Sequence, residues 1–301
     1  SRGLGDVYKR QLKDWGMNIL VGTVTSTPCV AVANETAADN MFQLTPSGSA
    51  TECVANPNVF RVCFSDPNQG TAAAQYIGEH KLATKVAIIY DSSDVYSSGI
   101  TQNFTAEAAN QGIEIVSSEA FTADNNKDFS VQLQKAKDGG AELVFLPIYY
   151  TEASLILAQA DSMGFETKFF GCDGMDGILG VENFDTSLAE GLMLLTPFAA
   201  DSTDEKTQNF VKAYGDAHNG EIPTQIAADT YDVLYAMQAA ANDARITPDM
   251  SNEDISAAMS ASMLNITLDG LTGEAKWTED GECDKAPKAY VIKDGVYASM
   301  E

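Results

Sequence analysis

Basic residues are scarce in this sequence of 301 residues, where 18 lysines and arginines stand against 43 aspartates and glutamates. The resulting net charge of −25 repels nucleic-acid phosphates and the head groups of anionic lipids. We therefore expect no nucleic-acid partner, and the simplest interpretation of the charge is a self-repelling surface.

Long apolar runs are also missing. No stretch of about 18 apolar residues occurs, so no segment is expected to span a membrane. The polar start, Ser1–Gln11, lacks the apolar core of a secretory signal and resembles a translated adaptor sequence. We expect a short foreign leader on a chain truncated at its N-terminus.

Residues and motifs typical of catalysis are few. The two histidines, His80 and His218, stand at the ends of predicted helices. The sequence contains no G-x-S-x-G, Walker, G-x-G-x-x-G or H-E-x-x-H motif. The run Asp124–Asp128 begins like a calcium loop, but Lys135 stands where that loop requires glutamate. We predict neither an enzyme nor a bound cofactor or metal.

The five cysteines include no C-x-x-C pair, so a zinc site is not expected. Cys53 and Cys63 flank a loop, and a disulfide between them would suit an exported protein. Five buried thiols are an equally good interpretation. The odd count leaves at least one cysteine unpaired within the chain.

Predicted strands and helices alternate along the first two thirds of the chain, which indicates an α/β fold with doubly wound, mostly parallel sheets. Helices are expected near residues 66–82, 98–111, 128–137 and 151–163, and strands at 17–22, 41–44, 85–90, 114–118, 143–148 and 168–171. After a strand at 192–196, helices dominate near 204–218, 224–244 and 252–263, followed by short strands at 270–276, 289–293 and 296–298.

Five of the predicted strands are followed closely by hydroxyl, phenol or carboxylate side chains: Ser26 and Thr27, Ser47 and Ser49, Tyr96, Tyr149 and Tyr150, and Asp173. In open α/β sheets, ligands bind outside the carboxyl ends of the strands. Because these groups form no catalytic set, they predict a receptor for a small molecule.

Eight stretches resemble, in order and spacing, the type I periplasmic solute-binding proteins of branched-chain amino acid ABC transporters. They are VGTVTSTP from Val21, QLTPSGSA from Gln43, VFRVCFSDPNQG from Val59, KVAIIYDSSDVYSSG from Lys85, FTADNNKDFS from Phe121, IYYTEASLI from Ile148, GCDGMDG from Gly171 and EGLMLLTPF from Glu190. The resemblance begins near Asn18 and lacks the family's opening strand–helix–strand unit.

This resemblance implies two lobes that close on a ligand. Lobe one, incomplete at its start, would hold residues 1–64 and 197–280, and lobe two residues 65–196 and 281–301. The chain would cross between lobes near Phe64–Asp66, Leu195–Pro197 and Asp280–Ala286.

The resemblance also implies roles for the polar groups on lobe one. Ser26, beside a predicted helix N-terminus, and Ser49 would donate to the carboxylate of a free amino acid. Thr27 precedes a proline and joins Ser26 in this group, and the Ser47 carbonyl would accept from the ligand's ammonium. A purely structural interpretation is that Ser26 and Thr27 cap a helix.

On lobe two, Asp173 matches the family's acidic ammonium acceptor, although Asp-Gly also favours a turn. Tyr96 and Tyr149 match wall positions whose hydroxyls would reach the ligand, with Tyr150 as the alternative to Tyr149. Core packing is the structural interpretation for each tyrosine. Asp176 and Asp66 are secondary candidates, Asp66 being better suited to a helix cap.

The implied function is that of an extracytoplasmic, monomeric binding component that delivers an amino acid to an ABC transporter permease. The implied location is the periplasm or the cell surface as a lipoprotein. Branched-chain amino acids follow from the resemblance alone, because relatives also bind amides and urea. A ligand-sensing domain of a membrane receptor or regulator with the same fold is the alternative.

Overall fold

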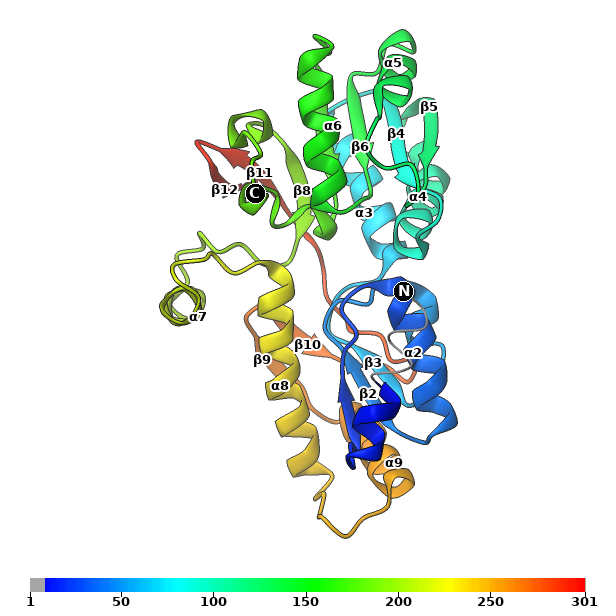
Figure 1. Cartoon of the computed structure of the whole chain (residues 1–301), viewed down its shortest axis with the longest axis vertical. Coiled ribbons are helices and arrows are strands. Elements are labelled where there is room, and N and C mark those ends of the chain that lie inside the picture. The colour runs from blue at the N-terminus through cyan, green and yellow to red at the C-terminus, as the bar shows by residue number, and fades with distance from the viewer. Residues whose placement is uncertain (1–8, 301) are drawn as a thin grey trace. The chain divides into compact units, whose positions relative to one another are not determined.

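The computed structural model of the chain describes residues 9–300 (Figure 1). It divides into two compact units, Ser1–Ser65 with Ile226–Ala286 and Asp66–Gln225 with Pro287–Glu301, here called unit 1 and unit 2. The predicted foreign leader lies mostly outside the described residues, and residues 9–14 are helical. Among the described residues, no helix has the length and apolar character needed to cross a membrane.

Unit 1 is built on a three-stranded parallel sheet in the order β1-β2-β3, with bounds Ile19–Val21, Phe42–Thr45 and Val59–Arg61. No strand is expected from the sequence at the position of β3. In this strand Phe60 pairs with Leu44 of β2, and all three residues are buried. A strand of three buried residues is too short to show the alternation of apolar and polar residues by which strands are predicted.

Besides the helical residues 9–14, unit 1 contains α2 (Ser26–Ala38), η1 (Thr51–Val54), α8 (Gln225–Asp243) and α9 (Asn252–Met263). Phe42 and Phe60 stack at 5.7 Å and pack with Val233 of α8 and Met259 of α9. This core holds the carboxyl ends of β1 and β2 in place, and the predicted ligand residues of lobe one follow those ends.

The single strand predicted at residues 270–276 is a hairpin, with β9 (Thr267–Gly270) antiparallel to β10 (Gly273–Lys276). Gly273 has φ +109°, a conformation that glycine adopts without steric strain. The buried Asp232 carboxylate accepts the N–H groups of Leu271 and Thr272, at 2.7 and 2.9 Å, and so fixes the turn from a distant helix.

Unit 2 contains a seven-stranded sheet in the order β12-β11-β8-β7-β6-β4-β5. The bounds are Val296–Ser299, Lys288–Lys293, Met193–Thr196, Lys168–Gly171, Leu143–Leu146, Lys85–Asp91 and Glu114–Phe121. The strands from β8 to β5 are parallel, and β11 and β12 add an antiparallel edge.

Helices cover both faces of this sheet: α3 (Asp66–Glu79), α4 (Val95–Ala108), α5 (Ser130–Asp138) and α6 (Tyr150–Ser162). Ile88 points into a core with α3 and α4, whereas its neighbour Ile89 points into a core with α5 and α6. This alternation confirms the doubly wound α/β prediction. The unit also contains α7 (Glu205–Ala217) and the short helices η2 (Asp173–Met175), η3 (Ile178–Gly180) and η4 (Thr186–Ala189).

Two segments, and the single residue Ser65, group differently from the predicted lobes. Residues 197–225 belong to unit 2, where Thr196 Oγ1 donates to Gln225 Oε1 at 3.0 Å and the Gln225 N–H donates to Asp176. Residues 281–286 belong to unit 1, where Glu282 pairs with the buried Arg61 at 3.0 Å. Side-chain bonds between distant positions therefore set both boundaries.

Candidate functional site

The predicted residues of unit 1 meet around Ser26, the first residue of α2. Its fully buried Oγ accepts the N–H groups of Ser49 at 3.2 Å and Ala50 at 3.1 Å, and lies 3.5 Å from Ser49 Oγ. Two accepted hydrogen bonds occupy both lone pairs, so Ser26 retains its hydroxyl proton as a donor. The backbone N–H of Ser49 is used within this cluster, so only the Ser49 hydroxyl remains as the donor that we expected for a ligand.

Thr27 and Ser47 lie beside this cluster and are half-buried. The helix begins two residues earlier than a cap at Thr27 predicts, with Thr25 as its N-cap, so Thr27 is its second residue and does not cap it. Ser47 Oγ donates to the Val24 carbonyl at 2.6 Å and closes the loop after β2 onto the loop after β1. The cluster thus offers neutral hydroxyl donors at a helix N-terminus, an environment that favours an anion.

In unit 2, Asp173 begins η2 two residues after the end of β7 and is 7% exposed. Tyr96 Oη donates to Asp173 Oδ1 at 2.8 Å and accepts the Gly174 N–H at 2.9 Å. Burial raises the pKa of Asp173 to about 6, against the opposing effect of its hydrogen bonds. The site therefore holds a carboxylate that gains from a cationic partner.

Tyr96 and Tyr149 stack with ring centroids 4.8 Å apart and an interplanar angle of 20°. Tyr96 is 2% exposed, and burial raises its pKa. Its hydroxyl, which we expected to reach the ligand, is engaged between Asp173 and Gly174 instead. In this geometry Tyr96 orients the carboxylate.

Tyr150 lies in different surroundings from Tyr149. It is the first residue of α6, 36% exposed, and lines a cavity of about 590 Å³ within unit 2 together with Asp176 and Tyr297. Neighbouring residues of an extended segment face opposite ways, so the sequence alone did not decide whether Tyr149 or Tyr150 is the wall residue. The structure places Tyr149 beside the Tyr96–Asp173 pair.

The two secondary acidic candidates are both buried. Asp176 accepts the Gln225 N–H, so it holds the start of α8 within unit 2. Asp66 begins α3 and packs against Gly99 of α4, where a Cβ would lie 3.0 Å from Asp66 Oδ2. These placements favour structural roles for both residues.

Sequence reasoning missed Gln69, the fourth residue of α3. It is fully buried, and its Oε1 accepts the Asp173 N–H at 3.3 Å. One feature of the sequence could have pointed to Gln69: its amide lies three residues after Asp66, on the face of the predicted helix that is buried, and buried polar groups need a hydrogen-bond partner. That signal names no partner, because Asp173 is 104 residues away in the sequence.

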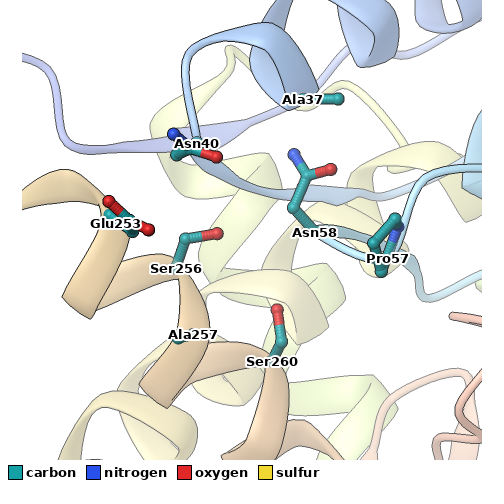
Figure 2. A pocket seen from close by; sticks show the side chains of 8 residues that line it. All are labelled: Ala37, Asn40, Pro57, Asn58, Glu253, Ser256, Ala257 and Ser260. Atoms are coloured by element: carbon teal, nitrogen blue, oxygen red, sulfur yellow. The ribbon is translucent and has the colours of Figure 1, made fainter.

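A cavity of about 360 Å³ lies within unit 1, away from all the predicted residues. Figure 2 shows Ser256, Ala257 and Ser260 of α9 facing Asn58 and Asn40 across this cavity. Small side chains and neutral amides line most of it, and the ligand groups predicted from the sequence do not contribute to it. We assign it no role in the site.

The cysteines and histidines form no metal site among the described residues. All five cysteines are buried, and the considered Cys53–Cys63 disulfide is not formed in this structure. Exposed His80 and His218 end helices and stack on Tyr76 and Tyr214, at 3.9 and 4.3 Å. The described part of the chain also has no group of three or more metal-ligating side chains.

Several known proteins are similar to this chain in sequence. The Leu/Ile/Val/Thr-binding protein of Salmonella typhimurium is 25% identical over 271 residues, which cover 89% of this chain and 70% of that protein. The Leu/Ile/Val-binding protein homolog 3 of Brucella melitensis is 30% identical over 162 residues, which cover 53% of this chain and 44% of that protein. The chain thus spans only part of the length of these relatives.

Solved structures share the fold. A leucine-binding protein from Thermotoga maritima superposes with TM-score 0.87 at 22% identity, over 99% of this chain and 83% of its own. A branched-chain amino acid transporter substrate-binding protein from Streptococcus pneumoniae, in complex with isoleucine, superposes with TM-score 0.84 at 24% identity. The match covers 98% of this chain and 82% of that protein. An ABC transporter solute-binding protein from R. palustris, in complex with benzoate, superposes with TM-score 0.86 at 16% identity. The match covers 98% of this chain and 80% of that protein.

The periplasmic binding protein family model matches residues 6–294, nearly the whole chain. The match spans both units and includes every predicted ligand residue. The resemblance seen in the ordered sequence motifs is therefore confirmed at the level of the family. The chain belongs to the periplasmic binding proteins.

Proposed function

We propose that this protein is the extracytoplasmic solute-binding component of an ABC transporter and captures a free amino acid. Branched-chain amino acids are the first candidates, because the Salmonella and Brucella relatives are named for binding leucine, isoleucine and valine. The ligand passes to a permease, and the binding protein acts as a monomer.

The observation that carries the proposal is the buried carboxylate of Asp173 with its stacked tyrosines. A carboxylate removed from water gains strongly from an ammonium that replaces the lost hydration. Tyr96 holds Oδ1 from one side at 2.8 Å, and Tyr149 stacks on Tyr96. This arrangement suits an amine flanked by apolar surface.

We assign the ligand's carboxylate to the Ser26–Ser49 hydroxyls of unit 1. These neutral donors stand at the N-terminus of α2, where backbone dipoles favour negative charge. A free amino acid has one carboxylate and one ammonium group, and each of these charges is chemically suited to one of the two groups of residues.

A carboxylic acid without an amine is the second candidate, since the R. palustris protein of the same fold was solved with benzoate. Asp173 argues against it here, because a buried carboxylate adds no favourable contact to an anion. Amides or urea, and a sensory role for the same fold, are the further alternatives.

Thermal unfolding against a panel of amino acids, amides and benzoate tests the proposal. A ligand present at 100 times its dissociation constant adds roughly 2.7 kcal/mol to the free energy of unfolding. We expect a shift with aliphatic amino acids but not with their deaminated analogues. A shift with benzoate alone would exclude the amino-acid assignment.

The location follows the family. Periplasmic binding proteins act outside the cytoplasmic membrane, and we propose the periplasm or, as a lipoprotein, the cell surface for this chain. Fractionation of cells expressing the full-length gene, with and without globomycin to block lipoprotein processing, distinguishes the two locations.

A further inference from the structure

Two buried sulfur atoms lie in contact beside the Ser26 cluster of unit 1. Cys29 follows Ser26 by three residues on α2, and Cys53 is the third residue of η1. Cys53 Sγ donates to the Ser26 carbonyl at 3.7 Å, so its sulfur lies against the turn of α2 that contains Cys29. The side chains of Cys29 and Cys53 are hydrogen-bonded to each other, and both residues are fully buried.

Cys29 is better placed than Cys63 to pair with Cys53. Its sulfur lies against the loop that leads into η1, because a Cβ on Gly48 would be 2.8 Å from Cys29 Sγ. Cys63 comes two residues after β3, and its charge affects Cys53 less than the hydrogen bond from Cys29 does. The sequence suggested Cys53–Cys63 because these residues flank one loop, whereas the packing of η1 on α2 is a tertiary contact.

We propose that Cys29 and Cys53 form a disulfide when the protein folds in an oxidising compartment, and that this bond holds η1 against α2. The bond fixes the loop whose Ser49 and Ala50 N–H groups donate to Ser26 Oγ. It therefore stabilises the hydroxyl cluster to which we assigned the ligand's carboxylate. The inference rests on the proposed extracytoplasmic location only for the source of the oxidant.

The reaction is thiol–disulfide exchange with a disulfide oxidant such as glutathione disulfide. The Cys29 thiolate attacks one sulfur of the oxidant, which forms a mixed disulfide and releases a first thiolate. Cys53 then loses its proton and attacks the Cys29 sulfur, which forms the Cys29–Cys53 bond and releases a second thiolate. The released thiolates take up the two protons that the cysteines lose, so two thiols are oxidised and one disulfide is reduced.

The burial of both sulfurs decides when this exchange takes place. An oxidant reaches them before unit 1 is fully packed or during local opening. The hydrogen bond from Cys53 lowers the pKa of Cys29 to about 7, against the opposing effect of burial, so Cys29 is the better attacking thiolate of the two. Once formed, the bond is shielded from reductants by the packed unit.

Peptide mapping of the whole chain tests the pairing. The protein is reduced in urea, refolded with reduced and oxidised glutathione, and treated with N-ethylmaleimide in denaturant to block the remaining thiols. Trypsin together with Glu-C places three cysteines in separate peptides: Cys29 in 14–35, Cys53 in 53–61 and Cys63 in 62–79. We expect the Cys29 and Cys53 peptides to be linked and to separate on reduction. A link between the Cys53 and Cys63 peptides, or alkylation of both Cys29 and Cys53, would overturn the proposal.

Urea unfolding with and without a reductant tests the same pairing by its effect on stability. A cross-link constrains the unfolded chain, so the oxidised wild type should unfold at a higher urea concentration than the reduced protein. Cys29→Ala and Cys53→Ala should remove this difference, and Cys63→Ala is the matched control that should keep it. The opposite pattern would contradict the assignment, and if a variant does not fold, the wild-type peptide map decides.

Hydrogen exchange at the Ser49 and Ala50 N–H groups tests the effect on the cluster. We expect exchange at both groups to be several-fold slower in the oxidised than in the reduced wild type, because the bond restricts opening of this loop. Equal exchange rates would show that the bond does not fix the loop. No ligand enters any of these measurements, so they are decided independently of whether the protein binds an amino acid.

Discussion

Tyr96 donates its phenolic proton to Asp173 Oδ1 at 2.8 Å, across 77 residues of sequence. The same hydroxyl accepts the Gly174 N–H, so one buried side chain orients both the carboxylate and the backbone beside it. A carboxylate held in this way is suited to a fixed ammonium and is poorly solvated without one.

Asp173→Asn should abolish amine recognition. The substitution keeps the size and an acceptor for Tyr96 but removes the charge, and we expect leucine affinity at pH 7 to fall by about 100-fold. Calorimetry measures the change. Asp128→Asn, at an exposed carboxylate of the same unit, is the matched control, and equal effects from both variants would contradict the assignment.

The same variant should be more stable than the wild type without ligand. The pKa of Asp173 is raised from 3.8 to about 6, so between these values the folded state binds more protons than the unfolded state. Stability from this group therefore falls as pH rises through the window, by about 3 kcal/mol at pH 7. Urea unfolding should show that Asp173→Asn is more stable than the wild type at pH 7 and nearly equal to it below pH 4. A stability difference between the two proteins that is the same at every pH would contradict the raised pKa of Asp173.

Gly174→Ala should disrupt the Tyr96–Asp173 pair. The added Cβ would lie 2.7 Å from Tyr96 Oη and 2.9 Å from the Ile148 carbonyl. We expect about 1–3 kcal/mol of destabilisation and weaker ligand binding. Gly180→Ala, where the new Cβ meets nothing within 4 Å, is the control, and thermal unfolding compares the two.

Substitutions at Ser26 and Ser49 should differ in their effect on stability, although both should weaken ligand binding. Ser26→Ala leaves two buried N–H groups without their acceptor, and we expect about 1–3 kcal/mol of destabilisation together with weaker binding. Ser49→Ala keeps its own N–H bonded to Ser26, so binding should weaken with little loss of stability. Unchanged stability of Ser26→Ala in urea unfolding would show that Ser26 does not hold this loop.

Glu282→Gln should destabilise unit 1, because Arg61 is fully buried and pairs with Glu282 at 3.0 Å. Since the Glu282 side chain is 32% exposed, we expect about 1–3 kcal/mol, below the loss for a fully buried pair. Asp216→Asn, in an exposed pair with Lys212, should change stability by less than about 0.5 kcal/mol in the same urea assay.

Local patterns in the sequence were enough to predict the alternation of strands and helices and the family. Each depends on neighbouring residues: periodicity along a strand, and motifs in a fixed order. They also placed Ser26, Tyr96 and Asp173 after strand ends, where parallel sheets bind ligands. The hairpin at residues 267–276 was missed because Asp232, far away in the sequence, fixes its turn.

The tertiary structure alone decided how these groups are used. It directed the Tyr96 hydroxyl to Asp173, placed Tyr149 rather than Tyr150 beside that pair, and brought in Gln69. Each result depends on contacts between residues remote in sequence. The raised pKa of Asp173 has the same origin, because burial is a property of the packed unit and is absent from the residue's immediate sequence.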